Sequence, residues 1–250
     1  GVGVDNVDLE AAAALDIPVL RSLGSNALAV AEHAISLMLA LLKQFPALDT
    51  AVKGGQWPKP SFIGRDIAGA RLGLIGFGAI GRETARLAVA LGMDVAVYDP
   101  HAAGEIAAAG LAVADDVEAL VSDVDIVSLH CPLTRETRNI VDAGLIARMG
   151  PQTLIVNTAR GGLIDEAALA AALADGRIAG AGLDSFAAEP PSPDGPLWAA
   201  PNLIVTPHVG GVTKGSAITM AETAARHIIS VLDGNPPDAR SLALPATLAA

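Results

Sequence analysis

From residue 71 to residue 206, short apolar runs alternate with segments that have the periodicity of helices. Within the runs, polar residues do not occupy every second position, a pattern typical of strands that are buried on both faces. Between the runs, apolar residues recur at helical spacing, as Ile80, Ala85, Leu87 and Ala88 do in the segment 79–91. This alternation predicts βαβ units and an α/β fold with a doubly wound parallel sheet. The predicted strands are Arg71–Gly76, Met93–Tyr98, Asp125–His130, Thr153–Thr158, Gly180–Leu183 and Leu203–Thr206.

Two long helical patterns flank this block, one over Ala27–Phe45 and the other over Thr213–Leu232. Residues 1–20 predict only a short helix and a strand, which are too few residues to form a domain alone. The Gly- and Pro-rich segment Gly54–Phe62 is interpreted as a linker or an arm. The shorter predicted elements are the helices Leu9–Leu15, Asp142–Met149 and Asp165–Ala174 and the strand Ile17–Leu20.

Charge and composition narrow the class of partner. The 250 residues carry a formal net charge of −11, which argues against binding to nucleic acid or to an anionic membrane surface. The apolar stretch Ala27–Leu42 is interrupted by Glu32 and His33 and is too short to span a bilayer, so no membrane partner is expected. Cys131 is the single cysteine and cannot form an intrachain disulfide, which favours a cytoplasmic location.

A glycine motif lies between a predicted strand and a predicted helix. Gly76, Gly78 and Gly81 match G-x-G-x-x-G, in which glycine permits a tight turn and lets a pyrophosphate approach the helix N-terminus. Asp99 follows at the end of the next strand, where an acidic residue accepts hydrogen bonds from a ribose hydroxyl. A carboxylate there repels a 2′-phosphate, so the pattern favours NAD over NADP. The alternative interpretation is that Asp99 and Pro100 only end a strand in a turn.

Three further residues carry candidate chemistry. Arg160 follows a buried strand, at the edge where open α/β sheets bind ligands, and its guanidinium suits a carboxylate. His208 follows another strand and can exchange a proton near neutral pH. Glu189 can orient an imidazole and favour its protonated form, although sequence alone does not place it beside His208. The alternatives are a surface arginine in a glycine turn, a structural histidine and a solvated loop glutamate.

The other histidines, His33, His101, His130 and His227, have no metal-ligand spacing. We interpret them as structural, with His130 close to the cofactor, and predict no metal site.

These motifs, in this order, resemble the D-isomer-specific 2-hydroxyacid dehydrogenase family, and its phosphoglycerate dehydrogenase branch most of all. The resemblance covers nearly the whole chain. It implies a Rossmann domain with a remnant of a flavodoxin-like substrate domain. The matching segments are Gly1–Ala11, Ala29–His33, the three glycines of the loop, Cys131–Thr137, Asn157–Glu166 and Pro207–Gly210.

The resemblance implies a role for each matching residue. Arg160 is expected to bind the substrate carboxylate and polarise the 2-oxo group, while His208 exchanges a proton with the substrate oxygen and Glu189 supports His208. The backbone at Val2 and Gly3 is expected to help hold the carboxylate. The cofactor NAD is expected to contact Gly76, Gly78, Ala79, Ile80, Gly81, Asp99, Cys131, Thr158, Ala159, Asp184 and Gly210.

Family members carry several tens of residues of substrate domain ahead of the segment that matches Gly1–Asp5. Residues 1–23 are therefore expected to be the remnant of that domain, residues 24–208 the NAD-binding domain, and residues 209–250 a helix that returns toward the substrate domain. The chain is either a piece of a longer protein or a truncated form. The resemblance also implies a homodimer that pairs through Ala27–Phe45 and Gly54–Phe62.

Three hypotheses about function follow. The first is an NAD-dependent oxidoreductase that interconverts a small 2-hydroxy acid and its 2-oxo acid, with a substrate like 3-phosphoglycerate, hydroxypyruvate or glyoxylate. The second is an NAD-responsive module that acts through partners, as the corepressor relatives of the family do. The third is a fragment that folds and binds NAD without turnover.

Overall fold

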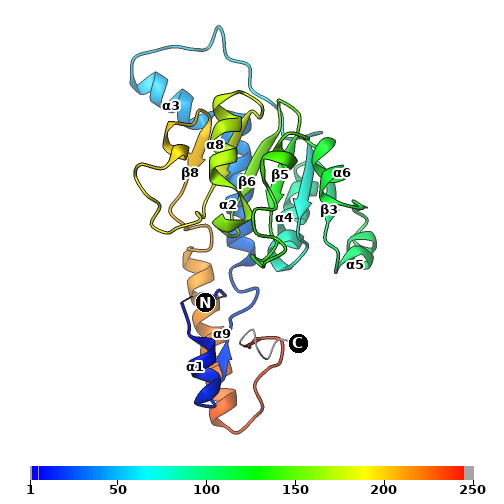
Figure 1. Cartoon of the computed structure of the whole chain (residues 1–250), viewed down its shortest axis with the longest axis vertical. Helices are drawn as coiled ribbons and strands as arrows, with labels where there is room; N and C mark the ends of the chain where they lie inside the picture. The colour runs from blue at the N-terminus through cyan, green and yellow to red at the C-terminus, as the bar shows by residue number, and fades with distance from the viewer. Residues whose placement is uncertain (1, 5, 245–250) are drawn as a thin grey trace. The chain divides into compact units, whose positions relative to one another are not determined.

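The structure is a computed structural model that describes residues 2–4 and 6–244 (Figure 1). These residues divide into two compact units, and each is described by itself. The larger unit is Val30–Gly210, and the smaller unit contains the described residues before and after it. The units therefore divide after residues 29 and 210, whereas the sequence predicts domain boundaries after residues 23 and 208.

Seven strands of the larger unit form one sheet in the order β4-β3-β2-β5-β6-β7-β8, and every neighbouring pair is parallel. The chain runs from β2 outward through β3 to β4, and then from β5 outward in the opposite direction to β8. This is the order of a doubly wound Rossmann sheet, with its switch point between β2 and β5. The strands are β2 (Arg71–Ile75), β3 (Asp94–Tyr98), β4 (Ala112–Val113), β5 (Ile126–Leu129), β6 (Leu154–Asn157), β7 (Gly180–Leu183) and β8 (Leu203–Val205).

Helices cover both faces of the sheet. Leu154 and Val156 of β6 pack with α2, α4 and α5 on one face, whereas Ile155 between them packs with α6, α7 and α8 on the other. Because successive side chains of a strand point to opposite faces, burial on both faces explains the continuous apolar runs. The predicted doubly wound parallel sheet is therefore confirmed. The helices are α2 (Ala27–Leu42), α3 (Phe45–Lys53), α4 (Ala79–Ala90), α5 (Ala103–Ala108), α6 (Val117–Ser122), α7 (Ala143–Ile146) and α8 (Glu166–Ala174), with 3₁₀ turns at Gly161–Leu163 and Pro196–Ala199.

The predicted helix Ala27–Phe45 is wrong at its end, because α2 stops at Leu42 and a second helix, α3, begins at Phe45. Gln44 between them has a left-handed backbone with φ of 51°. Pro46 has no N–H, so it cannot donate to the carbonyl of Leu42 as a continuous helix requires. That carbonyl accepts a hydrogen bond from the Arg65 N–H instead, at 3.0 Å.

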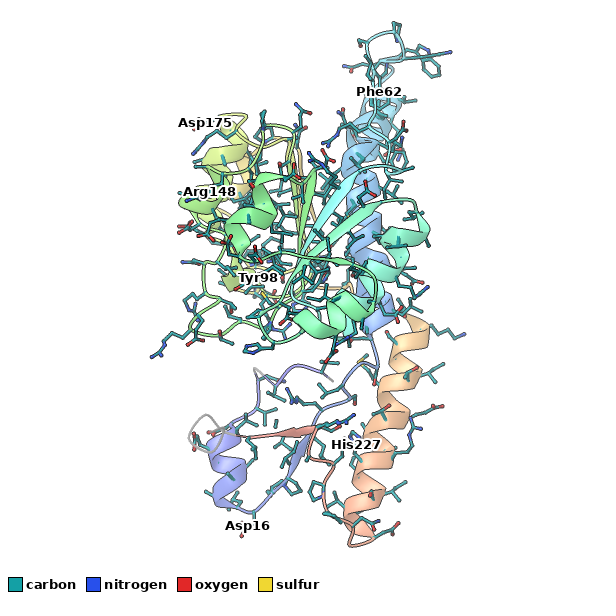
Figure 2. All side chains as sticks on the ribbon, turned by 90° about the vertical axis from the view of Figure 1, so that its right-hand side faces the viewer. Asp16, Phe62, Tyr98, Arg148, Asp175 and His227 are labelled. Carbon is teal, nitrogen blue, oxygen red and sulfur yellow. The ribbon has the colours of Figure 1, made fainter. Side chains whose placement is uncertain are left out.

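The segment between α3 and β2 begins with an irregular stretch that extends away from the rest of the larger unit, where Phe62 is labelled in Figure 2. Trp57 in this segment is 71% exposed and Ile63 is 89% exposed. They are two of the three most exposed large apolar side chains among the described residues.

The smaller unit contains α1 (Leu9–Ala14), α9 (Lys214–Leu232) and an antiparallel pair of two-residue strands, β1 (Val19–Leu20) and β9 (Leu242–Ala243). Thr213 caps α9 by accepting a hydrogen bond from the Ser216 N–H, and the Ser216 hydroxyl accepts one from the Thr213 N–H. This reciprocal capping box explains why the helix begins at Lys214. The assignment of this unit to a flavodoxin-like remnant stays a prediction.

Among the residues that the structure describes, no single helix is long and apolar enough to cross a membrane. The pair α2 and α3, which meet at 58°, passes the same test of length and composition only when the two are taken together. Met38 and Leu42 of α2 are buried against the sheet.

Candidate active site

The carboxyl edge of the sheet carries most of the polar side chains that the larger unit buries. His130 follows β5, Asn157 and Thr158 end and follow β6, and Asp184 and Ser185 follow β7, all of them buried. Ligands of doubly wound sheets bind at this edge, beside the switch point. Three polar atoms at this edge, the His130 Nδ1 and the hydroxyls of Thr158 and Ser185, are buried without a hydrogen-bond partner among the described residues. Because an unpartnered buried polar group costs free energy, this edge is the candidate binding site.

The glycine loop connects β2 to α4 at the switch point. Gly76 has φ of +102°, and a Cβ there would lie 2.6 Å from the Cys131 nitrogen, so only glycine fits. A Cβ on Gly81 would lie 2.3 Å from the carbonyl oxygen of Gly76, so the helix packs closely against the turn. Gly78 is the N-cap of α4, and a Cβ there would meet open space. The loop therefore presents the start of a twelve-residue helix to an anion without a side chain in the way.

Asp99 lies directly beyond the end of β3. One carboxylate oxygen accepts a hydrogen bond from the Phe77 N–H at 2.8 Å, and the other accepts one from the His101 N–H at 2.9 Å. The carboxylate therefore holds the glycine loop as well as its own turn. Each oxygen can accept a second hydrogen bond, which leaves Asp99 able to bind hydroxyl groups beside the loop.

His130 and Cys131 follow β5 and lie against Gly76. Burial lowers the pKa of the His130 imidazole to about 4 and raises the pKa of the Cys131 thiol to about 11. The His130 Nε2 lies 3.0 Å from the Ser128 hydroxyl. At neutral pH both side chains are uncharged, so His130 is not an imidazolium acid and Cys131 is not a thiolate nucleophile.

The pKa of His130 predicts a loss of stability in acid. In the unfolded chain the imidazole titrates near 6.5, so protons bind the unfolded state in preference as the pH falls from 6.5 toward 4. A gap of this size corresponds to about 3 kcal/mol, fully lost near pH 4. We expect the free energy of unfolding in urea to fall by about that much more in the wild type than in His130→Gln between pH 7 and pH 4. Equal losses in the two proteins would mean that His130 is not buried in its neutral form.

Arg160 lies three residues beyond the end of β6, in a segment ordered by Asn157. The Asn157 side chain accepts a hydrogen bond from the Ala159 N–H at 3.0 Å and donates one to the Arg160 carbonyl at 2.9 Å. The Arg160 guanidinium donates to the carbonyl of Ala159 at 2.8 Å. The backbone that presents the guanidinium is thus fixed by a polar residue at the end of a buried strand. Thr158 in this segment has a buried hydroxyl with no hydrogen-bond partner among the described residues.

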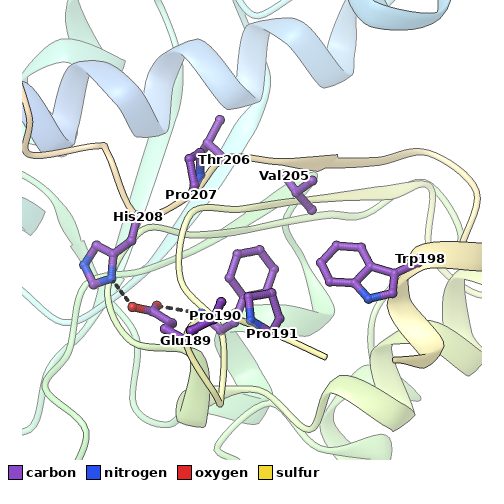
Figure 3. Close-up of a pocket in the computed structure, with 9 residues that line it drawn as sticks. Glu189, Pro190, Pro191, Trp198, Val205, Thr206, Pro207 and His208 are labelled. Atoms are coloured by element: carbon purple, nitrogen blue, oxygen red, sulfur yellow. Dashed lines mark hydrogen bonds and ion pairs between the residues drawn. The ribbon is translucent and has the colours of Figure 1, made fainter. Parts of the chain in front are cut away.

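Glu189 and His208 form a direct pair, drawn in Figure 3. The Nδ1 of His208 lies 2.7 Å from one carboxylate oxygen of Glu189, and the other oxygen accepts a hydrogen bond from the Phe186 N–H at 3.0 Å. A carboxylate accepts only, so Nδ1 carries a proton and the carboxylate sets the orientation of the ring. The His208 and Glu189 side chains are 43% and 39% exposed, so the pair is accessible to a ligand.

The loop that carries Glu189 rests on the segment that carries Arg160. A Cβ on Gly161 would lie 1.8 Å from the carbonyl carbon of Phe186, so the two backbones touch where glycine alone fits. Glu166, the first residue of α8, accepts a hydrogen bond from the Ala187 N–H at 2.7 Å. These contacts join the segments of Arg160 and Glu189, although the residues are far apart in the sequence.

An apolar cavity of about 410 Å³ opens beside the pair (Figure 3). Phe186 and Trp198 form a tilted aromatic contact in its wall, with ring centroids 5.8 Å apart. The other residues that line it are Glu189, Pro190, Pro191, Val205, Thr206, Pro207 and His208. Glu189 and His208 thus lie at the polar end of an otherwise apolar wall.

The remaining predicted positions divide between the two units. Ala79 and Ile80 begin α4 beside the glycine loop, and Gly210 lies against Asp184. Val2 and Gly3 belong to the smaller unit, and their part in a site stays a prediction. Within the described ranges 2–4 and 6–244, no group of three or more His, Cys, Asp or Glu side chains has the arrangement of a metal site.

Sequence reasoning missed two side chains that organise this edge. Glu166 reads as an acidic first-turn residue of a helix, and its reach to the Ala187 N–H follows only from the fold. His33 reads as a structural helix residue, yet its Nε2 lies 2.9 Å from the Thr206 hydroxyl. Neither Glu166 nor His33 carries a sequence signal for these contacts. The sequence does mark Asn157, because an amide at the end of an apolar run needs a buried hydrogen-bond partner.

Comparison with known proteins places this chain in a family. Residues 35–210 match the NAD-binding domain of the D-isomer specific 2-hydroxyacid dehydrogenases. The chain belongs to that family. The arrangement described above is therefore that of its NAD-binding domain.

Individual relatives and solved structures of this family resemble the chain over most of its length. The chain is 39% identical to a D-3-phosphoglycerate dehydrogenase of Archaeoglobus fulgidus over 94% of this chain, which corresponds to 45% of that protein. It is 42% identical to an (S)-sulfolactate dehydrogenase of Chromohalobacter salexigens over 86% of this chain and 70% of that protein. Among solved structures, a D-lactate dehydrogenase with NAD⁺ from Lactobacillus jensenii superimposes with a TM-score of 0.83 at 32% identity, over 94% of this chain and 75% of that one. The chain thus spans less than half the length of the phosphoglycerate dehydrogenase.

Proposed function

We propose that this chain is the NAD-binding and catalytic part of a dehydrogenase that interconverts a 2-hydroxy acid and its 2-oxo acid. The observation that carries the proposal is the His208–Glu189 pair at the carboxyl edge of an NAD-binding domain. An imidazole held by a carboxylate is a proton donor and acceptor of fixed orientation. The substrate class that we propose is a small acid such as 3-phosphoglycerate, hydroxypyruvate or glyoxylate.

The residues at the glycine loop fit a dinucleotide. The backbone at Ala79 and Ile80 would hold the pyrophosphate at the start of α4, Asp99 would bind the ribose of the adenosine half, and Cys131 would lie beside it. The unpartnered hydroxyl of Thr158 and the backbone of Ala159 would border the nicotinamide half. A 2′-phosphate would meet the negative charge of Asp99, so NAD is the proposed cofactor rather than NADP. When bound, NADH would supply the hydride in reduction, and NAD⁺ would accept it in oxidation.

His208 acts as the acid in reduction and as the base in oxidation. Because Nδ1 donates to Glu189, Nε2 is the atom that exchanges a proton with the oxygen at C2. The carboxylate of Glu189 stabilises the imidazolium and prevents the ring from turning away. It is itself fixed by the Phe186 N–H, so the ring orientation rests on the backbone.

Arg160 binds the carboxylate of the substrate and polarises the 2-oxo group. The planar guanidinium can donate two parallel hydrogen bonds to a carboxylate, which sets the orientation of C2 as well as its position. The Asn157 side chain bonds to the Ala159 N–H and to the Arg160 carbonyl, so the backbone from which the Arg160 side chain extends is fixed.

The experiment that tests the proposal uses the full-length gene product. NADH oxidation is followed with hydroxypyruvate, glyoxylate, 3-phosphohydroxypyruvate and 3-sulfopyruvate, and the most active acid is then assayed with NADPH. We expect turnover with at least one of these acids and a clear preference for NADH. Binding of NAD without turnover on any acid would favour a corepressor-like module or an inactive fragment.

We further propose that the protein is a cytoplasmic homodimer. Trp57 and Ile63 on the extended segment and Phe45 on α3 are large, exposed and apolar, and aromatic side chains of this kind are enriched where subunits meet. Static light scattering is expected to give twice the mass of one chain, and Trp57→Ser together with Ile63→Ser is expected to shift the mass toward that of a monomer. A monomeric wild type would refute the dimer.

A further inference from the structure

We propose that His33 is a positioning residue for His208, which it supports through Thr206 and the buried carboxylate of Asp184. We call the hydrogen bonds from Thr206, Val209 and Gly210 to Asp184 the clamp. The expected effect on turnover rests on the proposed function, whereas the clamp itself rests on geometry alone. All the residues concerned lie in the larger unit.

Asp184 holds the chain on both sides of His208. Its Oδ1 accepts hydrogen bonds from the Thr206 hydroxyl at 2.6 Å and from the Val209 N–H at 2.9 Å. Its Oδ2 accepts one from the Gly210 N–H at 2.8 Å. The carboxylate thus binds the residue two positions before the catalytic histidine and the two residues after it. A side chain that is only 2% exposed holds both ends of the turn.

The turn needs such a clamp because its backbone is strained. His208 has φ of +55°, in the left-handed region that residues other than glycine enter at a cost. Strain of this kind persists only where the surroundings hold the backbone in place. The hydrogen bond from the His208 N–H to the Thr206 carbonyl, at 3.0 Å, tightens the turn locally. The three hydrogen bonds to Asp184 then fix it to β7.

The directions of the hydrogen bonds assign the role of His33. The Thr206 hydroxyl has one hydrogen, and it donates this to the carboxylate of Asp184. The same hydroxyl lies 2.9 Å from the Nε2 of His33, so it accepts there and Nε2 carries the proton. Nε2 is also 3.5 Å from Asp184 Oδ1, which favours the same direction electrostatically. The result is a chain of donors from α2 to β7: His33 to Thr206, and Thr206 to Asp184.

The packing leaves this cluster little room to move. A Cβ on Gly210 would lie 2.8 Å from Asp184 Oδ2 and 3.3 Å from the His33 ring, so the chain after His208 passes closely over both side chains. Removing the His33 donor leaves the Thr206 hydroxyl free to rotate away from the carboxylate. The turn then loses its tie on the side that precedes His208, and the imidazole is less precisely aimed at the substrate oxygen.

The test compares paired variants of the full-length protein. His33→Leu removes the donor, whereas His33→Gln can still donate from a side-chain amide. Thr206→Val and Thr206→Ser form the same contrast at the next position. We expect His33→Leu and Thr206→Val each to lower kcat about tenfold, because a small misplacement of a catalytic group is costly, with KM and the Kd of NADH within about twofold of the wild type. The conservative partners should recover most of the loss, and the double variant should be no worse than either single one.

Amide hydrogen exchange measures the clamp independently of turnover. In His33→Leu we expect the Val209 and Gly210 amides to exchange about tenfold faster than in the wild type, while exchange in β6 is unchanged. Glu32→Gln, on the exposed side of the same helix, is the matched control and should change neither exchange nor kcat. Unchanged exchange at Val209 and Gly210 in both His33→Leu and Thr206→Val would overturn the clamp. An inactive wild type would refute the proposed function, but the hydrogen-exchange measurement would still decide whether the clamp exists.

Discussion

Replacing His208 with asparagine is expected to lower kcat by about 10³-fold while the Kd of NADH stays within about twofold, because general acid–base catalysis contributes gains of this order. Asparagine is the informative substitution because it tolerates the left-handed backbone that His208 adopts, with φ of +55°. It therefore removes the imidazole and leaves the turn. Steady-state NADH oxidation with the preferred 2-oxo acid gives kcat, and a fluorescence titration gives the Kd of NADH.

A second substitution separates chemistry from backbone effects. His208→Ala removes the imidazole and also strains the turn, so it should be at least as slow as His208→Asn and less stable to heat. If His208→Asn kept more than a tenth of the wild-type kcat, His208 would not be the acid. The proposed role of Glu189 would then have no partner to support.

Replacing Arg160 is expected to give the second large effect. Arg160→Gln should lower kcat/KM by about 10³-fold, because a charged, bidentate contact to the substrate carboxylate is lost and each charge-assisted hydrogen bond contributes about 1.5–3 kcal/mol. Arg160→Lys keeps the charge but not the planar fork, so its loss should be smaller, about 10²-fold. The affinity for NADH should be nearly unchanged in both variants.

The control for Arg160 is Arg177→Gln, which removes a charge from an exposed ion pair with Asp175. Such pairs contribute little to stability, and this one is not part of the proposed site. Its kcat/KM should equal that of the wild type. A loss of less than tenfold in Arg160→Gln, measured against that control, would mean that the substrate carboxylate is bound elsewhere.

Much of this fold follows from local pattern. β7 matches its predicted bounds, and most other strands differ from prediction by one residue at one end or at each end. The agreement is close because strands buried on both faces must be apolar throughout, which makes them visible in the sequence. The end of α2 was mispredicted because the apolar pattern continues through Phe45, although Pro46 excludes a continuous helix. The strand β4 lies within the apolar run 111–114 but is only two residues long and exposed, and the predicted strands do not include it.

The site was less predictable, since its contacts join distant residues. The chemistry of His208 and Glu189 follows from their residue types, but their 2.7 Å contact depends on the way the loop after β7 rests on Gly161. Asp184 was expected only to flank the cofactor, and its hold on Thr206, Val209 and Gly210 follows from the pairing of β7 with β8. No periodicity in a sequence carries such information.

The most direct test of the proposed chemistry is a crystal structure of the full-length protein with NAD⁺ and oxamate, an unreactive mimic of a 2-oxo acid. We predict that the oxamate carbonyl oxygen lies within about 3 Å of the Nε2 of His208, with the Arg160 guanidinium on its carboxylate. The Nδ1 of His208 should remain on Glu189. Oxamate bound with its carboxylate away from Arg160, or an imidazole turned away from both Glu189 and the oxamate oxygen, would contradict the account.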